Sequence, residues 1–218
     1  TFYDEITDYD LEIHTVSAGV AKRFGKVTVA TDYQYSHILL DNNSYLDMHM
    51  VSPSISGFAG DRLFLRAAYT YLRKGFVTSA NLDANTDMAA FDAYRFFAKR
   101  KGYIAIGLRY EDENAAGPQY DYRGLQGTVK AQIPFRLLKS NARAKLSYSY
   151  GERNYRSITP SIGVERFEKR STWNIGFELP LSKVLTFKPS LRFVDRDSNN
   201  PIYDYREHMI TGMLSYKL

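Results

Sequence analysis

Aromatic or apolar residues separated by one position recur in pairs along the chain, and each pair ends a segment in which apolar and polar residues alternate. The pairs recur about every forty residues, at Tyr33 and Tyr35, Tyr69 and Tyr71, Leu108 and Tyr110, Tyr148 and Tyr150, and Leu191 and Phe193. Alternation with a period of two places every second side chain on the same face of a β-strand. Hairpins that repeat with aromatic rings at one end are typical of a transmembrane β-barrel, where Tyr and Trp line the boundary between water and lipid.

These pairs predict an aromatic girdle at the outer edge of a membrane. We assign to it Tyr33, Tyr35, Tyr69, Tyr71, Tyr110, Tyr148, Tyr150 and Phe193. Eleven segments alternate in this way, and residues 63–71 show it clearly, with Leu63 and Leu65 on one face and Arg66 on the other. The predicted fold is all-β: an antiparallel transmembrane β-barrel with about eleven strands in this chain and twelve or more in the full protein.

The composition is compatible with such a barrel. Cysteine is absent, so the chain has neither a disulfide nor a thiolate metal site. The mean hydropathy is −0.40, and no run of residues approaches the ~18 apolar residues of a membrane-spanning helix. In a barrel this does not exclude a membrane, because polar residues that face the lumen dilute the hydropathy of every strand. The formal net charge of +5 at pH 7 is a weak indication of anionic partners.

The connections predict the orientation of the barrel. Short links between the predicted strands, at 24–26, 57–62, 99–102, 134–140 and 180–183, alternate with longer or more polar ones, at 41–44, 73–87, 112–121, 151–166 and 195–204. In outer-membrane barrels the short turns face the periplasm and the long loops face outward. We expect residues 1–218 to be one barrel domain, with 3–10 as a loop. Because bacterial barrels have even strand numbers and eleven strands are predicted here, we expect this domain to be the C-terminal part of a longer protein.

Two predicted strands, 11–23 and 45–55, change the parity of their apolar residues partway along. A β-bulge produces such a change, because it inserts one extra residue into a strand. A strand end that protrudes beyond the bilayer produces it too. The sequence leaves both explanations open.

Three segments carry a resemblance to a known group of barrels. They are 60–71, 109–122 and 196–205, which read GDRLFLRAAYTY, RYEDENAAGPQYDY and RDSNNPIYDY. They resemble the C-terminal barrels of tetratricopeptide-repeat outer-membrane proteins, such as surface lipoprotein assembly modulators and exopolysaccharide-export porins. The resemblance implies further strands and a periplasmic helical-repeat domain upstream, and a role in moving a polymer or a lipoprotein outward.

The polar faces of the predicted strands form the inner wall of the predicted barrel. The charged residues that we expect to line the lumen are Arg66, Arg95, Arg109, Glu111, Lys130, Arg143, Lys145, Arg170, Lys188 and Arg192. Charge rings set the selectivity of narrow pores, so this basic face indicates a conduit for an anionic solute, a polymer or a lipoprotein. The same residues fit a ladder of salt bridges that fills a closed lumen. That alternative makes the chain a non-conducting anchor that interacts through its outer loops.

Support for catalysis is slight. Two groups of titratable residues fall near the predicted outer rims: His37, Asp41, Asp47 and His49, and Glu207 with His208. They leave a rim hydrolase or a metal site as a third hypothesis. No hydrolase motif accompanies them, so we expect no enzyme activity, no catalytic residue, no metal and no cofactor.

The expected partners follow from the predicted fold. The apolar side of each strand is expected to contact the lipid bilayer of a Gram-negative outer membrane, including its lipopolysaccharide. Periplasmic or secreted proteins are further expected partners, and nucleic acid is not. The expected location is the cell outer membrane.

Overall fold

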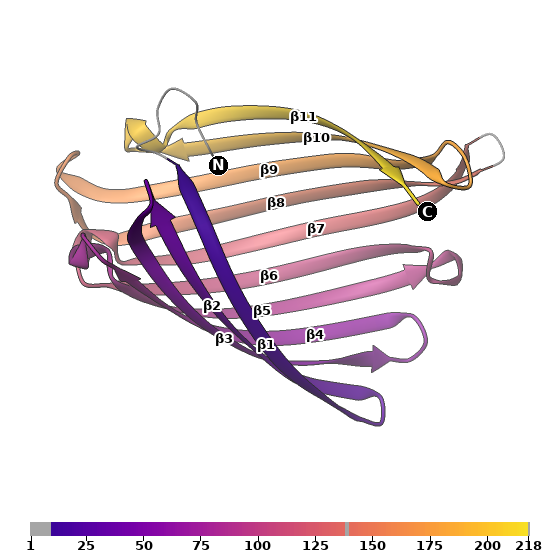
Figure 1. The fold of residues 1–218 in the computed structure, drawn as a ribbon, viewed down its shortest axis with the longest axis horizontal. Coiled ribbons are helices and arrows are strands. Elements are labelled where there is room, and N and C mark those ends of the chain that lie inside the picture. Colours follow the sequence, from indigo (N-terminus) through magenta and orange to yellow (C-terminus); the bar gives the residue numbers. More distant parts are fainter. Residues whose placement is uncertain (1–9, 138–139, 218) are drawn as a thin grey trace.

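A single antiparallel sheet runs through residues 10–137 and 140–217, the part of the chain that the computed structural model describes (Figure 1). The strands in these ranges are β1 (Leu11–Phe24), β2 (Val27–Leu40), β3 (Asn43–Ala59), β4 (Leu63–Phe76), β5 (Ala84–Phe97), β6 (Gly102–Ala115), β7 (Tyr122–Leu137), β8 (Ser140–Thr159), β9 (Val164–Pro180), β10 (Leu185–Ser198) and β11 (Tyr205–Tyr216). Short 3₁₀ turns lie between some of them: η2 (Ala80–Leu82), η3 (Ala98–Arg100), η4 (Pro118–Tyr120) and η5 (Pro201–Tyr203).

The prediction of about eleven antiparallel strands in this chain is confirmed for the described residues. Strands in other parts of the protein stay a prediction. The predicted loop at 3–10 lies outside the described residues except for Asp10. Within the described ranges, no helix has the length and apolar character needed to cross a membrane.

Each strand pairs with the next one along the chain, so the order runs from β1 to β11 without a crossover. Figure 1 shows the sheet bent into a trough, with β1 to β3 crossing at an angle in front of the middle strands. The strands are 12 to 20 residues long, whereas those of soluble proteins are usually ~5–6. Among the described residues no ladder joins β1 to β11, so the trough is open along these two edges.

Residue pairs across the ladders show which side chains share a face. One row crosses the sheet from β4 to β10 and consists of Arg66, Asp92, Gly107, Thr128, Ser149, Thr172 and Val194. The adjacent row, on the opposite face, consists of Leu65, Ala93, Ile106, Val129, Tyr148, Trp173 and Phe193. The first row is mainly small and polar, and the second is apolar.

The polar face is the concave one. On this face Ala105 and Val194 are 3% and 2% exposed, whereas Ile106 and Trp173 on the other face are 55% and 52% exposed. In a curved sheet the side chains of the concave side converge and cover one another, while those of the convex side spread apart. The sheet therefore has an apolar outer face and a polar inner face, which is the arrangement of a barrel that spans a bilayer.

The predicted outer loops are wrong in length. The predicted loop 151–166 is mostly strand: β8 extends to Thr159 and β9 begins at Val164, so the connection is only 160–163. In the same way, the predicted loop 73–87 is reduced to a connection at 77–83. Polar residues do not interrupt a strand beyond the apolar band, because backbone hydrogen bonds continue there while both faces find water or ion-pair partners.

The two strands with a change of parity share one explanation. Residues 11–24 pair with 27–40 without irregularity, and the bulge in β3 falls at Tyr45, before the change. In both strands the loop end instead turns its apolar residues inward. This inner apolar patch contains Ile13, Ile38, Leu46, Met48 and Met50. The change of parity therefore marks where the apolar face passes from the convex to the concave side.

Two glycines, Gly57 near the turn end of β3 and Gly75 at the loop end of β4, test how closely the strands pack. A Cβ added to Gly57 would lie 2.6 Å from the carbonyl oxygen of Lys26, whereas one added to Gly75 would meet no atom within 4 Å. We expect Gly57→Ala to lower the free energy of unfolding by about 1–3 kcal/mol, because backbone must shift to admit the methyl group. Gly75→Ala should change it by less than about 1 kcal/mol. Urea unfolding in detergent micelles measures both, and equal midpoints would contradict the close contact at Gly57.

Candidate functional site

Nine of the ten charged residues that the sequence assigns to the lumen share the concave face. They are Arg66, Arg109, Glu111, Lys130, Arg143, Lys145, Arg170, Lys188 and Arg192. Cross-strand pairing places them on this face. Lys130, for example, lies opposite Ala105, which is on the concave side. Their role as the lining of a water-filled lumen stays a prediction.

Arg95 is the exception, and its assignment to the inner face is wrong. It lies opposite Leu63 on β4 and Ile104 on β6, and both of these residues are exposed on the convex face. The pattern misleads at this strand end because Tyr94 and Phe96, although aromatic, face inward. Arg95 is near the turn end of β5, where a long side chain can extend its charge to water along an apolar surface.

The eight predicted girdle residues all lie on the convex face, toward the loop ends of their strands. Several of their hydroxyl groups donate to polar residues of neighbouring strands. Tyr71 donates to Asn85 at 2.8 Å. Tyr35 donates to Asp47 at 2.6 Å. Each of these rings combines an apolar body with an anchored polar tip, which suits a boundary between lipid and water, and that boundary stays a prediction.

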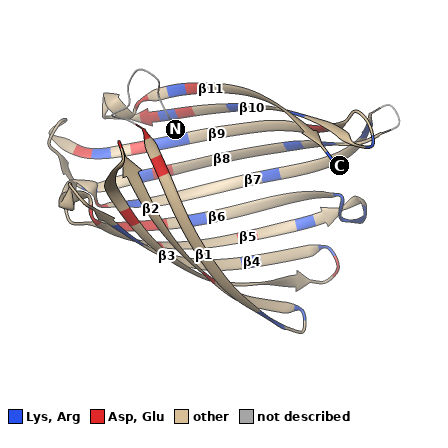
Figure 2. Cartoon of the chain, viewed as in Figure 1, with Lys and Arg blue, Asp and Glu red and all other residues tan. Residues whose placement is uncertain are grey.

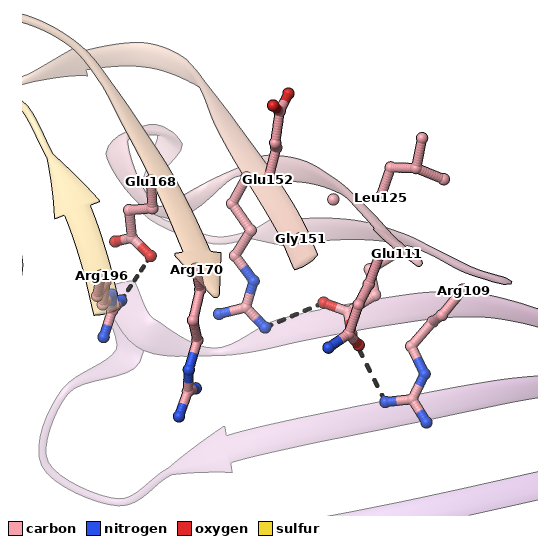
Figure 3. A pocket seen from close by; sticks show the side chains of 11 residues that line it. Arg109, Glu111, Leu125, Gly151, Glu152, Glu168, Arg170 and Arg196 are labelled. Carbon is pink, nitrogen blue, oxygen red and sulfur yellow. Dashed lines mark hydrogen bonds and ion pairs between the residues drawn. The ribbon is translucent and has the colours of Figure 1, made fainter. Parts of the chain in front are cut away.

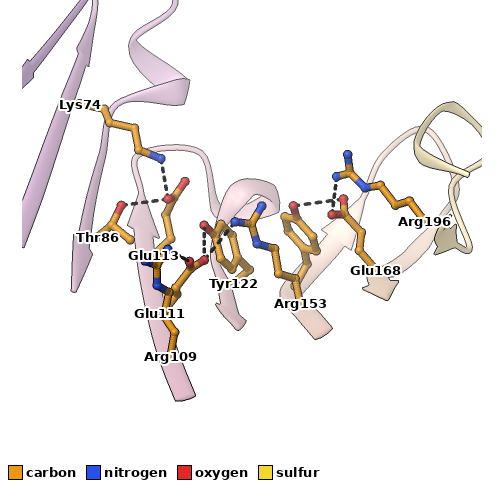
Figure 4. Close-up of polar contacts among 10 residues, drawn as sticks. Lys74, Thr86, Arg109, Glu111, Glu113, Tyr122, Arg153, Glu168 and Arg196 are labelled. Atoms are coloured by element: carbon orange, nitrogen blue, oxygen red, sulfur yellow. Dashed lines mark hydrogen bonds and ion pairs between the residues drawn. The ribbon is translucent and has the colours of Figure 1, made fainter. Parts of the chain in front are cut away.

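A ladder of ion pairs crosses the concave face beyond the level of the girdle (Figure 4). At one end, Lys74 on β4 binds Glu113 on β6 at 2.6 Å. Thr86 lies between them on β5 and donates to the same carboxylate at 2.9 Å. Glu113 is 8% exposed, so its charge is compensated by protein groups rather than by water.

In the middle of the ladder, Arg153 on β8 reaches past β7 to Glu111 on β6, at 3.0 Å. It passes Gly124, the residue of β7 that lies between the two in the ladder, and its guanidinium lies 4.6 Å from the ring centroid of the nearby Tyr122. The Tyr122 hydroxyl donates to the same carboxylate at 3.4 Å. A charge-assisted hydrogen bond and a cation–π contact thus hold β6, β7 and β8 at one level.

At the far end of the ladder, Arg166 on β9 lies between two tyrosine rings. Its guanidinium is 3.7 Å from the centroid of Tyr155 and 4.2 Å from that of Tyr203. Glu168 binds Arg166 at 3.3 Å and Arg196 at 2.5 Å. The Tyr155 hydroxyl donates to the same carboxylate at 3.3 Å. Because the side chains of Arg166 and Glu168 are only 7% and 4% exposed, both charges depend on these contacts.

Burial raises the pKa of two tyrosine hydroxyls in the ladder. Tyr122 and Tyr155 lie opposite each other, beyond Tyr110 and Tyr150 toward the loops and so outside the segments expected to cross the hydrocarbon. Burial, reinforced by the charge of Glu168, raises the pKa of Tyr155 to about 12. Burial also raises the pKa of Tyr122. Both hydroxyl groups therefore remain protonated, and donors to the carboxylates, at alkaline pH values where an ordinary tyrosine ionises.

Beside the ladder, the concave face has a hollow of about 270 Å³ (Figure 3). Its inward-facing charged residues are Arg109, Glu111, Arg153, Glu168, Arg170 and Arg196. Figure 3 shows Arg109 and Arg170 pointing into the hollow, while Leu125 and Glu152 point the opposite way. Four guanidinium groups and two carboxylates leave an excess of positive charge. Guanidinium groups suit carboxylates and phosphates, whose oxygens can accept two hydrogen bonds at once.

The basic residues continue from this hollow toward the turn end. Arg109 also borders a hollow of about 280 Å³ in the middle of the wall. Lys130 connects that hollow to another of about 470 Å³, which Lys145 and Arg192 line as well. Figure 2 shows Lys and Arg spaced along the middle strands, while most Asp and Glu lie near the strand ends. The concave face therefore carries a basic track along the strand direction.

Much of the charge on this track is not compensated. Arg143 and Lys145 share Glu178, with Arg143 at 3.1 Å. By contrast, the following inner cations make no ion pair with any described residue: Lys130, Arg170, Lys188 and Arg192. The middle of the wall thus differs from its loop end, where the cations are held by carboxylates.

Aromatic rings gather on the concave face at the turn end, a cluster that the alternation pattern does not reveal. The members are Phe58, Phe64, Tyr94, Phe96 and Tyr103. Their neighbouring centroids are 5.2 to 6.3 Å apart. The Arg100 guanidinium lies 4.6 Å from the Phe58 centroid. The inner wall therefore has an aromatic patch at one end and the ion-pair ladder at the other.

Most of the ladder falls where the sequence predicts loops. Arg153 and Tyr155 lie in the predicted loop 151–166, yet they belong to β8. A signal was present, because a period of two continues through this polar stretch, with Arg153 and Tyr155 on one face and then Arg166 and Glu168 on the paired strand. The prediction failed because polarity was given more weight than periodicity.

The titratable residues predicted at one outer rim come together only in part. His37 Nδ1 lies 2.8 Å from Asp47 Oδ1. His49 Nδ1 lies 2.9 Å from the Tyr33 hydroxyl. Asp41 belongs to the two-residue turn between β2 and β3. In the described ranges, no three His, Asp or Glu side chains are grouped so that they could hold a metal ion.

The second predicted rim group does not form. Glu207 lies opposite Val194, and its neighbour His208 lies opposite Phe193, so the two side chains point to opposite faces of β11. The His208 ring packs edge-on against Phe193, with centroids 5.2 Å apart. The pair therefore shares no site.

Comparisons with known proteins identify the fold but no family. No family model matches the chain, and no curated protein matches its sequence. Among solved structures, the siderophore receptor PirA from Acinetobacter baumannii matches with a TM-score of 0.62 at 9% identity, over 99% of this chain and 39% of that chain. PirA from Pseudomonas aeruginosa matches with a TM-score of 0.59 at 9% identity, over 96% of this chain and 39% of that one.

A third similar structure is a loop-deletion mutant of OmpT, an outer membrane protein of Vibrio cholerae. Its TM-score is 0.63 at 9% identity, over 92% of this chain and 62% of that chain. The chain thus spans less than two thirds of each of these structures. At such identities the likeness shows the fold alone. That fold is the outer-membrane β-barrel, which confirms the predicted fold class and the outer-membrane location that it implies, while the resemblance to tetratricopeptide-repeat barrels stays a prediction.

The ladder yields a stability prediction. Glu168→Ala leaves the buried Arg166 and the partly buried Arg196 without their carboxylate, so we expect the free energy of unfolding to fall by about 3–5 kcal/mol. Asp195→Ala is the matched control, because the pair of Asp195 with Arg206 is 58% and 77% exposed; it should change stability by less than about 1 kcal/mol. Urea unfolding in micelles compares them. A loss at Glu168 no larger than at Asp195 would refute the structural role of the ladder.

Proposed function

We propose that this chain forms the wall of an outer-membrane conduit whose basic inner face carries an anionic solute or polymer. The observation that carries this proposal is the line of inner cations, from Arg170 through Lys130 and Arg192 to Lys188, that makes no ion pair with the described residues. Charge without local compensation on a concave wall raises the local concentration of anions. It also favours their passage through a narrow bore.

The spacing of the basic track supports a polymer over a single small anion. Three adjacent hollows follow one another along the wall, and Arg109 and Lys130 each border two of them. A chain with repeated acidic groups can contact several cations at once, and each contact is weak enough to be exchanged for the next. Conduction requires sites of this kind, which bind well enough to admit the cargo and weakly enough to release it.

The aromatic patch also supports a polymer as the cargo. Phe58, Phe64 and Tyr94 present apolar ring surface on the inner wall at the turn end, which is periplasmic in the expected orientation. Sugar rings carry apolar C–H faces that pack against aromatic rings. A polymer with sugar units and acidic groups would therefore find complementary surfaces at both the patch and the basic track.

A bilayer requires the trough to be closed. The open edges of β1 and β11 carry backbone groups that hydrocarbon cannot satisfy. We infer that at least one further strand, from a longer form of the protein, joins these edges and completes an even-numbered barrel. The apolar convex face then contacts outer-membrane lipid, and the tyrosine girdle marks the outer boundary.

A second candidate function has its own observation. The ladder from Lys74 to Arg196 has buried carboxylates at Glu113 and Glu168 and is highly connected, as expected of a stiff barrel that serves as an anchor for other proteins. Conductance separates the two candidates. An anchor gives no stable current in a planar bilayer, whereas a conduit gives discrete channel openings.

The conduit makes a prediction about ion selectivity. In the full-length protein in a planar bilayer, we expect an anion preference that falls roughly twofold or more in the double variant Lys130→Gln and Arg192→Gln, because two uncompensated inner charges are removed. The reversal potential under a salt gradient measures it. The matched control is Arg95→Gln with Arg206→Gln, which removes the same charge from the convex face and should leave selectivity unchanged. Absence of any current, or an equal effect in both doubles, would overturn the proposal.

A further inference from the structure

The hairpin of β2 and β3 carries a serine, a histidine and an aspartate in hydrogen-bonded series on the convex face. The Oγ of Ser44 lies 3.4 Å from Nε2 of His37. The Nδ1 of the same ring lies 2.8 Å from Oδ1 of Asp47. Each ring nitrogen thus has one partner, in the order of a serine hydrolase triad.

The bulge in β3 is what brings Ser44 to this face. Ile38 lies opposite Leu46, and Leu39 lies opposite Ser44, so Tyr45 is the extra residue. Without that extra residue Ser44 would stand one position later in the ladder and point to the concave side. Bulges re-aim side chains in this way and are frequent beside active sites.

The third member of the series is itself held in place. Asp47 Oδ1 accepts a hydrogen bond from the Tyr35 hydroxyl at 2.6 Å, in addition to its contact with His37. With Nδ1–H donated to Asp47, the Nε2 lone pair of His37 is directed to the hydroxyl of Ser44. The separation of 3.4 Å is long for a hydrogen bond, as is common for a nucleophile and its base before substrate binds.

The position on the barrel indicates the substrate. His37 follows the girdle residues Tyr33 and Tyr35 on the same face of the same strand, so the site lies about 7 Å beyond the girdle toward the loops. The ester groups of membrane lipids lie between the hydrocarbon and the head groups, at this level. Below the site, Val16 and Val51 are 69% and 39% exposed on the convex face and provide apolar surface for an acyl chain.

The site is also open to a substrate. The side chains of His37 and Asp47 are 29% and 40% exposed, and Ser44 is exposed. We propose that Ser44, His37 and Asp47 hydrolyse an acyl ester of an outer-leaflet membrane lipid. This activity goes beyond the conduit and uses the opposite face of the wall. It also departs from the expectation of a chain without catalytic residues.

The reaction balances with water as the only co-reactant. Ser44 Oγ attacks the ester carbonyl carbon while its proton passes to His37 Nε2, and the bond from that carbon to the alcohol oxygen breaks. The alcohol leaves with the proton from His37, and the acyl group remains on Ser44. A water molecule, deprotonated by His37, then attacks the acyl-serine, which releases the fatty acid and restores the Ser44 hydroxyl. Asp47 keeps the ring in the required tautomer throughout.

The experiment uses the full-length protein in detergent micelles. One arm contains a diacyl phospholipid and the other contains lipopolysaccharide, and mass spectrometry measures the fatty acid released. We expect release in one arm, which identifies the ester source, and a fall of at least about 10³-fold in Ser44→Ala. A fluorophosphonate probe should label Ser44 in the wild type. Release in neither arm, or equal release by Ser44→Ala, would overturn the proposal.

Two further variants separate catalysis from folding. Ser54→Ala removes a serine of the same strand whose side chain faces the concave side, opposite Ala30 and Ala68, and should keep full activity. His37→Ala should lose activity and regain part of it with added imidazole, which a merely structural histidine would not do. Because conductance depends on the inner wall, Ser44→Ala should conduct as the wild type does, so this proposal and the conduit can fail independently.

Discussion

Hydrogen bonding between the backbones of consecutive strands is the constraint on which the rest of this structure depends. Hydrocarbon offers no partner to an amide or a carbonyl, so each strand that crosses it must be paired along its length. The meander from β1 to β11 meets this requirement with neighbours in sequence alone. The same ladder sets which residues share a face, and it thereby determines both the apolar surface and the basic wall. Among the described strands, only the backbone groups along the open edges of β1 and β11 still need a hydrogen-bonding partner.

The ion-pair ladder and the basic track divide the inner wall into two regions with different electrostatics. At the loop end, buried cations such as Arg166 are held by carboxylates and tyrosine rings, and breaking a pair there is costly. In the middle of the wall, cations such as Lys130 face a small-residue surface with Gly107 and Thr128 and are available to a mobile anion. The first region stiffens the sheet, and under the proposed function the second is where an anionic cargo binds and is exchanged.

The two proposals use opposite faces of the same sheet. Because successive side chains of a strand alternate between the faces, a single hairpin can contribute to the bore and to the lipid-facing surface at once. At Tyr45 a bulge shifts the alternation by one residue, so that Ser44 lies on the convex face beside His37. Such a site acts on molecules in the membrane, whereas the conduit acts on molecules that cross it. One protein could therefore modify the lipid that surrounds its own pore.

The sequence by itself determined the strands, their alternation and the inward orientation of nine of the ten charged residues assigned to the lumen, because a period of two is a local property of a β-strand. The sequence-based prediction was wrong for the face of Arg95, because the neighbouring aromatic residues point inward. It was also wrong for 151–166, where a polar composition suggested a loop although the residues form strand. Only the tertiary structure decided which inner charges meet: Arg153 reaches Glu111 across an intervening strand, and Arg196 meets Glu168. The same holds for Ser44, whose face depends on a bulge in the pairing with β2. Contacts of this kind depend on register and curvature between strands, which no single segment of the sequence encodes.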